Sequence, residues 1–262
     1  MDLGLSGKVA VVTGGSEGIG RGAAQSLGRE GVSVVVCARR EDLLRSAAAE
    51  LAEATGAQIV PVRADVTLAG DVERVIQTAV DRFGRLDILV NNAGTSAAGP
   101  FESVTDDAWQ ADLDLKLFGA IRATRAAVPH LRKVGGGSIV NVLNVGAKQP
   151  AARSVPTSVS RAAGMALMKA LSKELGADNI RVNGINIGLI KSGQNQRRWE
   201  SLGRPGTLEE FYAQLARQTN VPLGRVGEAE EVGDLIAFLC SSRGAYISGV
   251  SINMDGGSSG VV

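Results

Sequence analysis

The sequence predicts an α/β fold, with one domain built on a parallel seven-stranded sheet that is doubly wound, with helices on both faces. Short runs rich in Val and Ile alternate with longer stretches of helical periodicity, the pattern of parallel strands joined by crossover helices. These runs are almost continuously apolar, as expected for strands buried on both faces. A length of 262 residues suits a single domain that buries a large core without disulfides.

The expected elements follow one another in regular alternation. We expect strands at residues 8–12, 33–37, 58–63, 86–91, 138–143, 180–187 and 250–253. Crossover helices are expected at residues 19–30, 41–54, 69–83, 105–131, 156–175 and 229–241. No internal repeat, low-complexity tract or linker interrupts residues 1–262, so these elements form one doubly wound sheet.

One segment departs from this alternation. Residues 192–219 begin with polar and charged side chains and continue through Gly203-Arg-Pro-Gly206 into a short amphipathic helix. Insertions that follow the carboxyl end of a strand commonly carry binding functions. We therefore expect residues 192–219 to form a mobile lid over a substrate.

Charge and cysteine content exclude several classes of protein. The chain has 28 Lys and Arg against 27 Asp and Glu, so no global field attracts nucleic acid or an anionic membrane. Cys37 and Cys240 lack metal-ligand spacing and each ends an apolar run, which predicts buried free thiols and no metal site. No apolar run approaches the ~20 residues that span a bilayer, and the N-terminus lacks the apolar core of a leader, which predicts a cytoplasmic protein.

The first strand-to-helix turn carries the clearest ligand signal. It reads Thr13-Gly-Gly-Ser-Glu-Gly-Ile-Gly20. Glycines at positions 14, 18 and 20 permit a tight turn, a close approach of backbone to a pyrophosphate, and close packing of helix on strand. The helix N-terminus then stabilises negative charge. Because the turn lies in a βαβ unit, it predicts a dinucleotide phosphate site, and a purely structural turn is the alternative.

The end of the second strand distinguishes between the two nicotinamide cofactors. A carboxylate there accepts hydrogen bonds from the adenosine ribose diol, whereas a cation pairs with a 2′-phosphate. The chain has Arg39 and Arg40 at this place and no acid. A guanidinium holds a phosphate through two charge-assisted hydrogen bonds, which predicts NADP(H) in preference to NAD(H). Two solvated arginines that open a helix are the alternative.

Several motifs together resemble those of the short-chain dehydrogenase/reductase family over essentially the whole chain. Beside the glycine-rich turn they are Asp65-Val66, Asn91-Asn-Ala-Gly94, Tyr246-Ile-Ser-Gly249 and Asn253-Met-Asp-Gly-Gly257. The resemblance implies a Rossmann-type fold, a small-molecule substrate and a homodimer or homotetramer. It also implies that the first two motifs contact the cofactor and that the last two form a closing strand. Many NADP-using members carry a basic residue at the place of Glu17.

The family's catalytic places are all occupied by other residues. The segment Gly137-Ser-Ile-Val-Asn-Val-Leu-Asn144 resembles the strand that ends in the family's catalytic Ser, and the helix expected from residue 156 resembles the one that carries Tyr-x-x-x-Lys. In place of the family's Ser, Tyr, Lys and Asn the chain has Asn144, Thr157, Arg161 and Lys116.

These four residues predict a changed polar site. Thr157 needs help as a proton donor, because an aliphatic hydroxyl is a far weaker acid than a phenol. Arg161 keeps a positive charge for the ribose hydroxyls, and Asn144 can bond to a substrate oxygen. If burial beside Arg161 lowers the pKa of Lys116, that residue can act as a relocated ammonium or as a general acid. The alternative is a Lys116 whose stem covers the helix and whose head reaches water.

Other residues were considered for the missing acid. Tyr212 lies in the expected lid, where packing against Phe211 is the competing interpretation. Tyr246 belongs to the closing motif and is excluded, and His130 is expected at the surface. We expect Lys191 to be a free cation near the substrate entrance that attracts an anionic substrate.

The cofactor-binding residues that we expect are Thr13, Gly14, Ser16, Gly18, Ile19, Gly20, Arg39, Arg40, Asp65, Val66, Asn91, Ala93, Gly94, Arg161, Ile190 and Ser192. Two functional classes follow from these expectations. The first is an NADP(H)-dependent oxidoreductase that acts on a carbonyl or secondary alcohol. The second is an NADP(H)-binding protein of the same fold without redox activity, either a non-redox enzyme or a ligand-binding subunit. The resemblance favours the first class, and the missing phenol favours the second.

Overall fold

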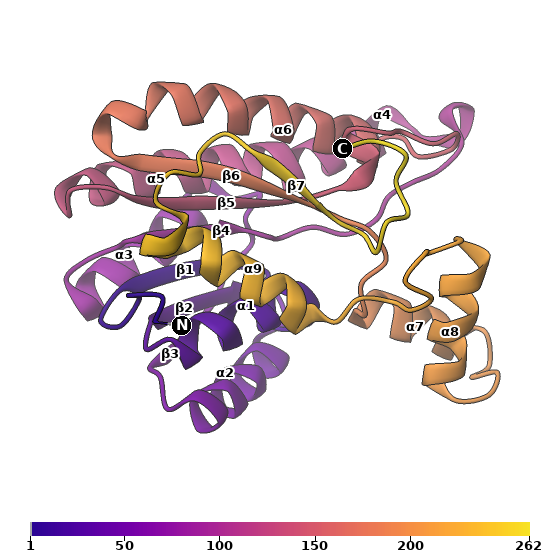
Figure 1. Ribbon diagram of the computed structural model, residues 1–262, viewed down its shortest axis with the longest axis horizontal. Helices are drawn as coiled ribbons and strands as arrows, with labels where there is room; N and C mark the ends of the chain where they lie inside the picture. Colours follow the sequence, from indigo (N-terminus) through magenta and orange to yellow (C-terminus); the bar gives the residue numbers. More distant parts are fainter. Residues whose placement is uncertain (1) are drawn as a thin grey trace.

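A computed structural model describes residues 2–262 and places seven parallel strands in one sheet, in the order β3-β2-β1-β4-β5-β6-β7 (Figure 1). The strands are β1 (Val9–Thr13), β2 (Ser33–Ala38), β3 (Ile59–Arg63), β4 (Ile88–Asn91), β5 (Gly137–Asn144), β6 (Ile180–Ile187) and β7 (Ser251–Met254). The strand order reverses between β1 and β4, and such a reversal leaves a crevice at the carboxyl ends of the strands.

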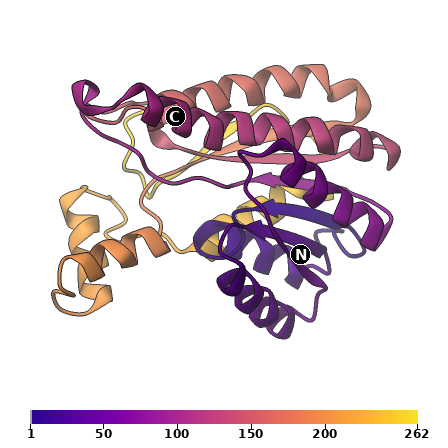
Figure 2. The ribbon, with the colours of Figure 1, turned by 180° about the vertical axis from the view of Figure 1, so that it is seen from behind.

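Helices cover both faces of this sheet (Figures 1 and 2). They are α1 (Gly18–Arg29), α2 (Glu41–Thr55), α3 (Ala69–Phe83), α4 (Asp106–Leu113), α5 (Gly119–Lys133), α6 (Thr157–Glu174), α7 (Gly193–Ser201), α8 (Leu208–Gln218) and α9 (Ala229–Cys240). The helices α1, α2 and α9 share one hydrophobic cluster, and α3, α5 and α6 share another. The predicted fold class is therefore confirmed.

Each face of the sheet has its own core because neighbouring strand residues point to opposite sides. On β1, Val12 belongs to the cluster that contains Leu27 of α1, whereas Val11 belongs to the cluster that contains Ile76 of α3. All four of these side chains are buried. The rigid sheet between two packed layers fixes the positions of the strand ends, where the candidate site lies.

The predicted strands and most predicted helices are confirmed, with ends that differ by one or two residues. The continuous helix expected at 105–131 is wrong. It divides into α4, the π-helical turn η2 (Asp114–Phe118) and α5. A π turn adds a residue to the helical repeat and often marks a functional position. Here it carries Lys116, whose buried side chain is anchored outside its own helix.

Residues 192–219 contain two helices where the sequence predicted one. The expected amphipathic helix is α8, which begins with a capping box formed by Thr207 and Glu210. The polar stretch before it forms α7, whose first turn is capped by the Ser192 side chain, which accepts from the Asn195 amide at 3.4 Å. The two helices project from the sheet as a separate lobe (Figure 1).

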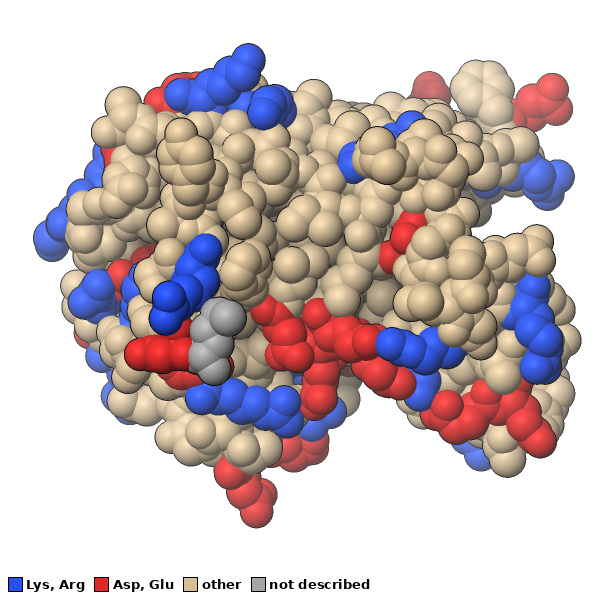
Figure 3. Space-filling model, in the orientation of Figure 1, with Lys and Arg blue, Asp and Glu red and all other residues tan. Residues whose placement is uncertain are grey.

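The α7–α8 lobe has a small hydrophobic core of its own, which includes Phe211, Tyr212 and Leu215. Charged side chains gather where the lobe joins the body, with acidic and basic groups side by side (Figure 3). An ion pair in this region joins Arg197 of α7 to Glu17 of the turn between β1 and α1 at 3.0 Å. The lobe is therefore packed internally and attached at its base through charged contacts.

The two cysteines are buried free thiols, as predicted. Burial raises the pKa of Cys37 to about 12 and that of Cys240 to about 11, so neither is a thiolate at neutral pH. Within residues 2–262, no helix combines the length and the apolar character required to cross a bilayer.

Candidate functional site

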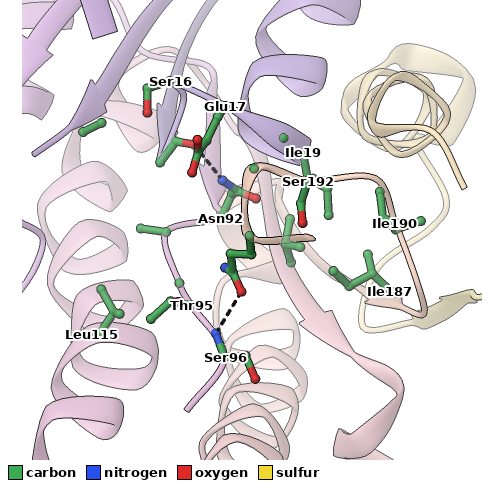
Figure 4. Close-up of a pocket in the computed structure, with 18 of the residues that line it drawn as sticks. Ser16, Glu17, Ile19, Asn92, Thr95, Ser96, Leu115, Ile187, Ile190 and Ser192 are labelled. Atoms are coloured by element: carbon green, nitrogen blue, oxygen red, sulfur yellow. Dashed lines mark hydrogen bonds between the residues drawn. The ribbon is translucent and has the colours of Figure 1, made fainter. Parts of the chain in front are cut away.

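A cavity of about 540 Å³ lies at the carboxyl ends of the central strands (Figure 4). Its walls come from the turn between β1 and α1, the ends of β2, β4, β5 and β6, and the start of α7. Ser16, Asn92 and Ser192, which come from three of these segments, line it together (Figure 4). The site therefore depends on the sheet to bring distant parts of the chain together.

The glycine-rich turn has the geometry that the sequence predicted. Gly14 and Gly18 adopt positive φ angles of 71° and 56°, which other residues rarely adopt. A Cβ atom on Gly14 would lie 2.9 Å from the Asn92 amide nitrogen. That nitrogen donates to the Thr13 and Gly14 carbonyls at 2.9 and 3.1 Å. The backbone of the turn thus lines the cavity, and the Asn92 side chain fixes its conformation.

Most of the expected cofactor-binding residues line the cavity, and three of them, Thr13, Gly20 and Asn91, do not. The Thr13 hydroxyl accepts from the backbone amides of Asn92 and Ala93 at 3.0 and 3.1 Å, so it joins β1 to the loop after β4. Asn91 is buried and donates to Asn141 at 2.9 Å. Thr13 and Asn91 therefore stabilise the segments that line the cavity and do not line it themselves. The neighbouring Asn92 faces it, and we did not single out that residue from the sequence.

Arg39 and Arg40 lie at the end of β2 and differ in whether their guanidinium groups are paired with an acid. Arg40 forms an ion pair with Glu17 at 2.9 Å, and Glu17 also pairs with Arg197 of α7 at 3.0 Å. Burial acts to raise the pKa of Glu17, but the bonds from Arg197 and Arg40 outweigh it and lower the pKa. Arg39 is exposed and has no ion-pair partner within residues 2–262. It is therefore the cation at this end of the cavity that is free to meet a phosphate.

A ring of hydrogen bonds connects α4 and η2 with α6. Lys116 forms an ion pair with Asp112 and donates to the Thr157 hydroxyl at 2.9 Å. Ser160 closes the ring by donating to the other Asp112 oxygen at 2.6 Å. Because residues three or four apart share a helix face, each helix presents two polar groups to the other. Lys116 and Thr157 therefore converge within hydrogen-bond range.

The Thr157 hydroxyl has a defined polarity. Its oxygen accepts from Lys116 Nζ at 2.9 Å and from the Ala97 backbone amide at 3.0 Å. A hydroxyl has two acceptor lone pairs and one hydrogen, so both lone pairs are occupied. Thr157 also lines the cavity. Its own hydrogen is thus free to be donated to a ligand oxygen.

Lys116 is buried, and the alternative in which its head reaches water is wrong. Its side chain is 1% exposed. Burial lowers the pKa of its ammonium, Asp112 opposes that effect, and the nearby Arg161 adds to it. The prediction that burial beside Arg161 lowers this pKa is confirmed in direction.

Arg161 lies across the loop after β4. Its Nη1 donates to the Val142 carbonyl at 2.8 Å, and a Cβ atom on Gly94 would lie 2.5 Å from its Nη2. Burial lowers the pKa of Arg161 to about 10, so it remains a cation at neutral pH. Two buried polar atoms beside the cavity, Arg161 Nε and Asn144 Oδ1, have no hydrogen-bond partner within residues 2–262. Such unsatisfied atoms are what a polar ligand would engage.

The remaining candidates do not supply an acid. Tyr212 is 5% exposed and packs with Phe211 in the core of the lobe, as the competing interpretation held. Tyr246 is fully exposed, and His130 is half-buried and does not line the cavity. The expectation that Lys191 is a free cation is wrong, because it pairs with Glu209 and Glu228 and lies over the Tyr212 ring.

Two residues of the hydrogen-bonded ring, Asp112 and Ser160, were not predicted from the sequence. Asp112 precedes Lys116 by four residues and Ser160 follows Thr157 by three, so both spacings suit helical neighbours. That spacing was the available signal, but it is common on solvated helices. Within the described part of the chain, no cluster of three or more His, Cys, Asp and Glu could bind a metal.

Sequence comparisons agree with this geometry. The family model described as Enoyl-(Acyl carrier protein) reductase matches residues 14–259. Dehydrogenase/reductase SDR family member 4 of Oryctolagus cuniculus is 36% identical over 254 residues, which covers 97% of this chain and 94% of that protein.

Structural comparisons give two further likenesses. The L-sorbose reductase from Gluconobacter frateurii, complexed with NADPH and L-sorbose, has a TM-score of 0.95 and 36% identity and covers 100% of both chains. An NADPH-bound short-chain oxidoreductase from Pseudomonas aeruginosa PAO1, said to contain an atypical catalytic center, has a TM-score of 0.91 and 38% identity and covers 97% of this chain and 98% of its own.

Proposed function

The chain belongs to the short-chain dehydrogenase/reductase family, and from this premise we propose that it is an NADP(H)-dependent oxidoreductase. Its substrate is a carbonyl compound or the corresponding secondary alcohol. The observation that carries the proposal is the hydrogen bond of 2.9 Å from Lys116 to Thr157. It puts a cationic proton donor directly behind a hydroxyl that lines the cavity, at the place of the family's phenol.

The residues around the cavity fit a nicotinamide dinucleotide. Gly14 and Gly94 leave no room for a Cβ atom, so the backbone itself forms the wall that a dinucleotide would contact. Arg39 is the free cation that a 2′-phosphate would pair with, which favours NADP(H) over NAD(H). The two relatives of known structure described above hold NADPH. When bound, NADP(H) supplies or accepts the hydride.

The protein's own part in the reaction is to handle the proton. In the direction of reduction, Thr157 donates its hydroxyl hydrogen to the substrate oxygen as negative charge develops there. Lys116 returns a proton to the Thr157 oxygen along the existing hydrogen bond. An aliphatic hydroxyl is a poor acid alone, and a cationic donor behind it prevents an alkoxide from accumulating.

Arg161 and Asn144 complete the site as binding residues. Each has a buried polar atom at the cavity that needs a partner. We assign Arg161 to the ribose hydroxyls of the cofactor, because it stays charged and lies against Gly94. We assign Asn144 to the substrate oxygen. Neither residue transfers the proton.

The start of α7 provides the substrate side of the cavity, and we propose that residues 192–219 act as a lid. The Gln194 side chain accepts from the Ser96 amide at 3.3 Å, a bond that joins the lid to the loop after β4 (Figure 4). Asn195 also lines the cavity there. These polar side chains favour a hydrophilic carbonyl substrate such as a ketose, in keeping with the L-sorbose held by the Gluconobacter frateurii relative. Lys191 is already paired and gives no support to an anionic substrate.

We also propose a homodimer or homotetramer. Tyr246 and Val250, which belong to the closing segment, are exposed, and exposed apolar side chains there suit contact with a second subunit. Light scattering after size-exclusion chromatography measures the assembly directly. A protein that stays monomeric at micromolar concentration would contradict this proposal.

The deciding experiment is titration of the purified protein with NADPH and with NADH, followed by assays of cofactor oxidation on a panel of ketoses, keto acids and aliphatic ketones. We expect tighter binding of NADPH and turnover with at least one polar carbonyl. Absence of binding would overturn the cofactor assignment. Tight NADPH binding with no turnover would instead favour the non-redox alternative, which the missing phenol supports.

Two substitutions test the acid–base set itself. We expect Lys116→Ala to reduce turnover and Arg161→Ala to weaken NADPH binding. Lys133→Ala, a change at an exposed lysine at the end of α5, is the matched control. If both site variants bind NADPH and turn over like the control, the chemistry assigned to this site is wrong.

A further inference from the structure

Asp112 is a buried carboxylate to which the chemistry above assigns no role. Its side chain and that of Lys116 are each 1% exposed, and an ion pair joins them. Its other oxygen accepts from the Ser160 hydroxyl at 2.6 Å. The carboxylate is thus fixed from α6 on one side and bonded to the ammonium on the other. A buried charge with both oxygens engaged has a single available orientation.

The four groups form a closed ring that determines where the ammonium points. Lys116 donates to the Thr157 hydroxyl, and Ser160 donates its single hydroxyl hydrogen to Asp112 at 2.6 Å. The Thr157 carbonyl oxygen lies 3.0 Å from the same Ser160 oxygen. A lysine side chain alone is a flexible stem with a mobile head. Here Asp112 holds one hydrogen of that head, so another is directed at the Thr157 oxygen.

The buried cluster around Lys116 contains more cations than carboxylates. Asp112 faces it from α4, and Arg161 acts on it from α6. On α5, Arg122 pairs with Asp114 at 3.1 Å and takes no part in the cluster. Two cations therefore share one carboxylate. If that carboxylate were removed, burial and Arg161 would both favour the neutral amine of Lys116.

We propose that Asp112 is a positioning residue that keeps Lys116 charged and aimed at the Thr157 hydroxyl, so that the proton for the substrate oxygen is available where it is needed. This inference rests on the proposed reductase function. It adds a fifth residue, which the family's catalytic places do not include, to the four that replace them.

The proton and electron balance of the step is complete. The carbonyl carbon gains a hydride from the reduced nicotinamide, the carbon–oxygen π bond breaks, and the oxygen takes the Thr157 hydrogen. Lys116 gives a proton to the Thr157 oxygen and becomes a neutral amine. After the product leaves, solvent in the cavity restores that proton through the Thr157 hydroxyl, which lines the cavity and is hydrogen-bonded to Lys116. Asp112 forms no bond to the substrate, and none of its covalent bonds changes in the step.

Lysine side-chain nitrogen NMR tests the inference without any turnover. The Lys116 signal is assigned by its loss in Lys116→Met, and its titration is followed in the native protein and in Asp112→Asn. We expect the amine in Asp112→Asn to lose its proton at lower pH than in the native protein. Asp114→Asn is the matched control, because it removes a carboxylate two residues away that pairs with Arg122. Equal titration of Lys116 in all three proteins would refute the proposal.

Turnover provides the second measurement. In Asp112→Asn we expect kcat to fall by about 100-fold, with a steeper loss toward alkaline pH and an unchanged Kd for NADPH. A merely structural role would lower the melting temperature and leave the pH profile in place, and that result would also refute the proposal. If native protein reduces no carbonyl, the proposed function fails, and the Lys116 titration still decides the role of Asp112.

Asp112→Glu covers the case in which Asp112→Asn does not fold. The longer carboxylate keeps the charge, so we expect Lys116 to stay protonated to nearly the same pH as in native protein. The displaced ammonium should still lower kcat. A Lys116 that titrates early despite this carboxylate would overturn the inference.

Discussion

Replacement of Thr157 by valine tests the central contact of the site. Valine has nearly the shape of threonine, so the change removes a hydroxyl without opening a large cavity. It takes away the acceptor of Lys116 at 2.9 Å and of the Ala97 amide at 3.0 Å, at a side chain that is 7% exposed. Loss of a charged hydrogen bond costs about 1.5–3 kcal/mol and of a neutral one about 0.5–1.5 kcal/mol. We therefore expect the free energy of unfolding to fall by about 2–4.5 kcal/mol.

Thr157→Val is also expected to lower the turnover rate. A positioned acid contributes about 100- to 10,000-fold to rate, so Thr157→Val should lose turnover in that range while it keeps its affinity for NADPH. Urea unfolding and NADPH oxidation with the best carbonyl substrate measure the two effects. Thr157→Ser, which keeps the hydroxyl, is the control and should retain most activity. Native-like turnover in Thr157→Val would show that the proton takes another route.

Three further outcomes are expected. Arg39→Ala should weaken NADPH binding by about ten- to 100-fold and leave NADH binding unchanged, and equal weakening of both would contradict a 2′-phosphate contact. Glu17→Gln breaks the ion pair with Arg197 at 3.0 Å and should speed amide exchange in α7, with little change in overall stability because these side chains are partly solvated. The bond from Arg225 lowers the pKa of Glu231 from 4.5 to about 2, so the stability it adds above pH 4.5 is lost as pH falls toward 2. Urea unfolding should show a flatter acid dependence in Glu231→Gln, and an unchanged slope would refute this.

The sequence pattern predicted the sheet well because local and tertiary preferences agree there. The runs that form β1 and β2 contribute apolar side chains to the cores on both faces of the sheet, and such a composition suits a central parallel strand. The long helix was mispredicted because periodicity alone does not reveal a π turn. The turn at η2 is associated with Lys116, whose partner Thr157 lies 41 residues along the chain.

The part of the site that depends on local backbone conformation was predicted, and the part that depends on distant partners was not. Gly14 and Gly18 were predicted because their positive φ angles disfavour most other residues, so the conformation is visible in the sequence as glycine. Asn92 was not predicted and Lys191 was mispredicted, because the roles of both depend on partners that come close only in the folded chain. Lys191 is paired with Glu209 of α8 and Glu228 beside α9, and neither pairing has a local sequence signal.

What the sequence alone determined is the frame: a doubly wound sheet, the glycine-rich turn, and four polar residues at the family's catalytic places. The sheet and the turn follow from apolar periodicity and backbone conformation, which act over short stretches of chain, and the four polar residues follow from the resemblance to the family. What only the tertiary structure decided is how those four residues are buried and which partners they have. The direction of the Thr157 hydroxyl depends on the Ala97 amide and on Lys116, which reach it from other parts of the chain. The burial of Lys116 depends on the packing of η2 and Asp112 against α6. Hydrogen bonds and desolvation are set by the atoms that surround a group in space, and these are known only from the folded chain.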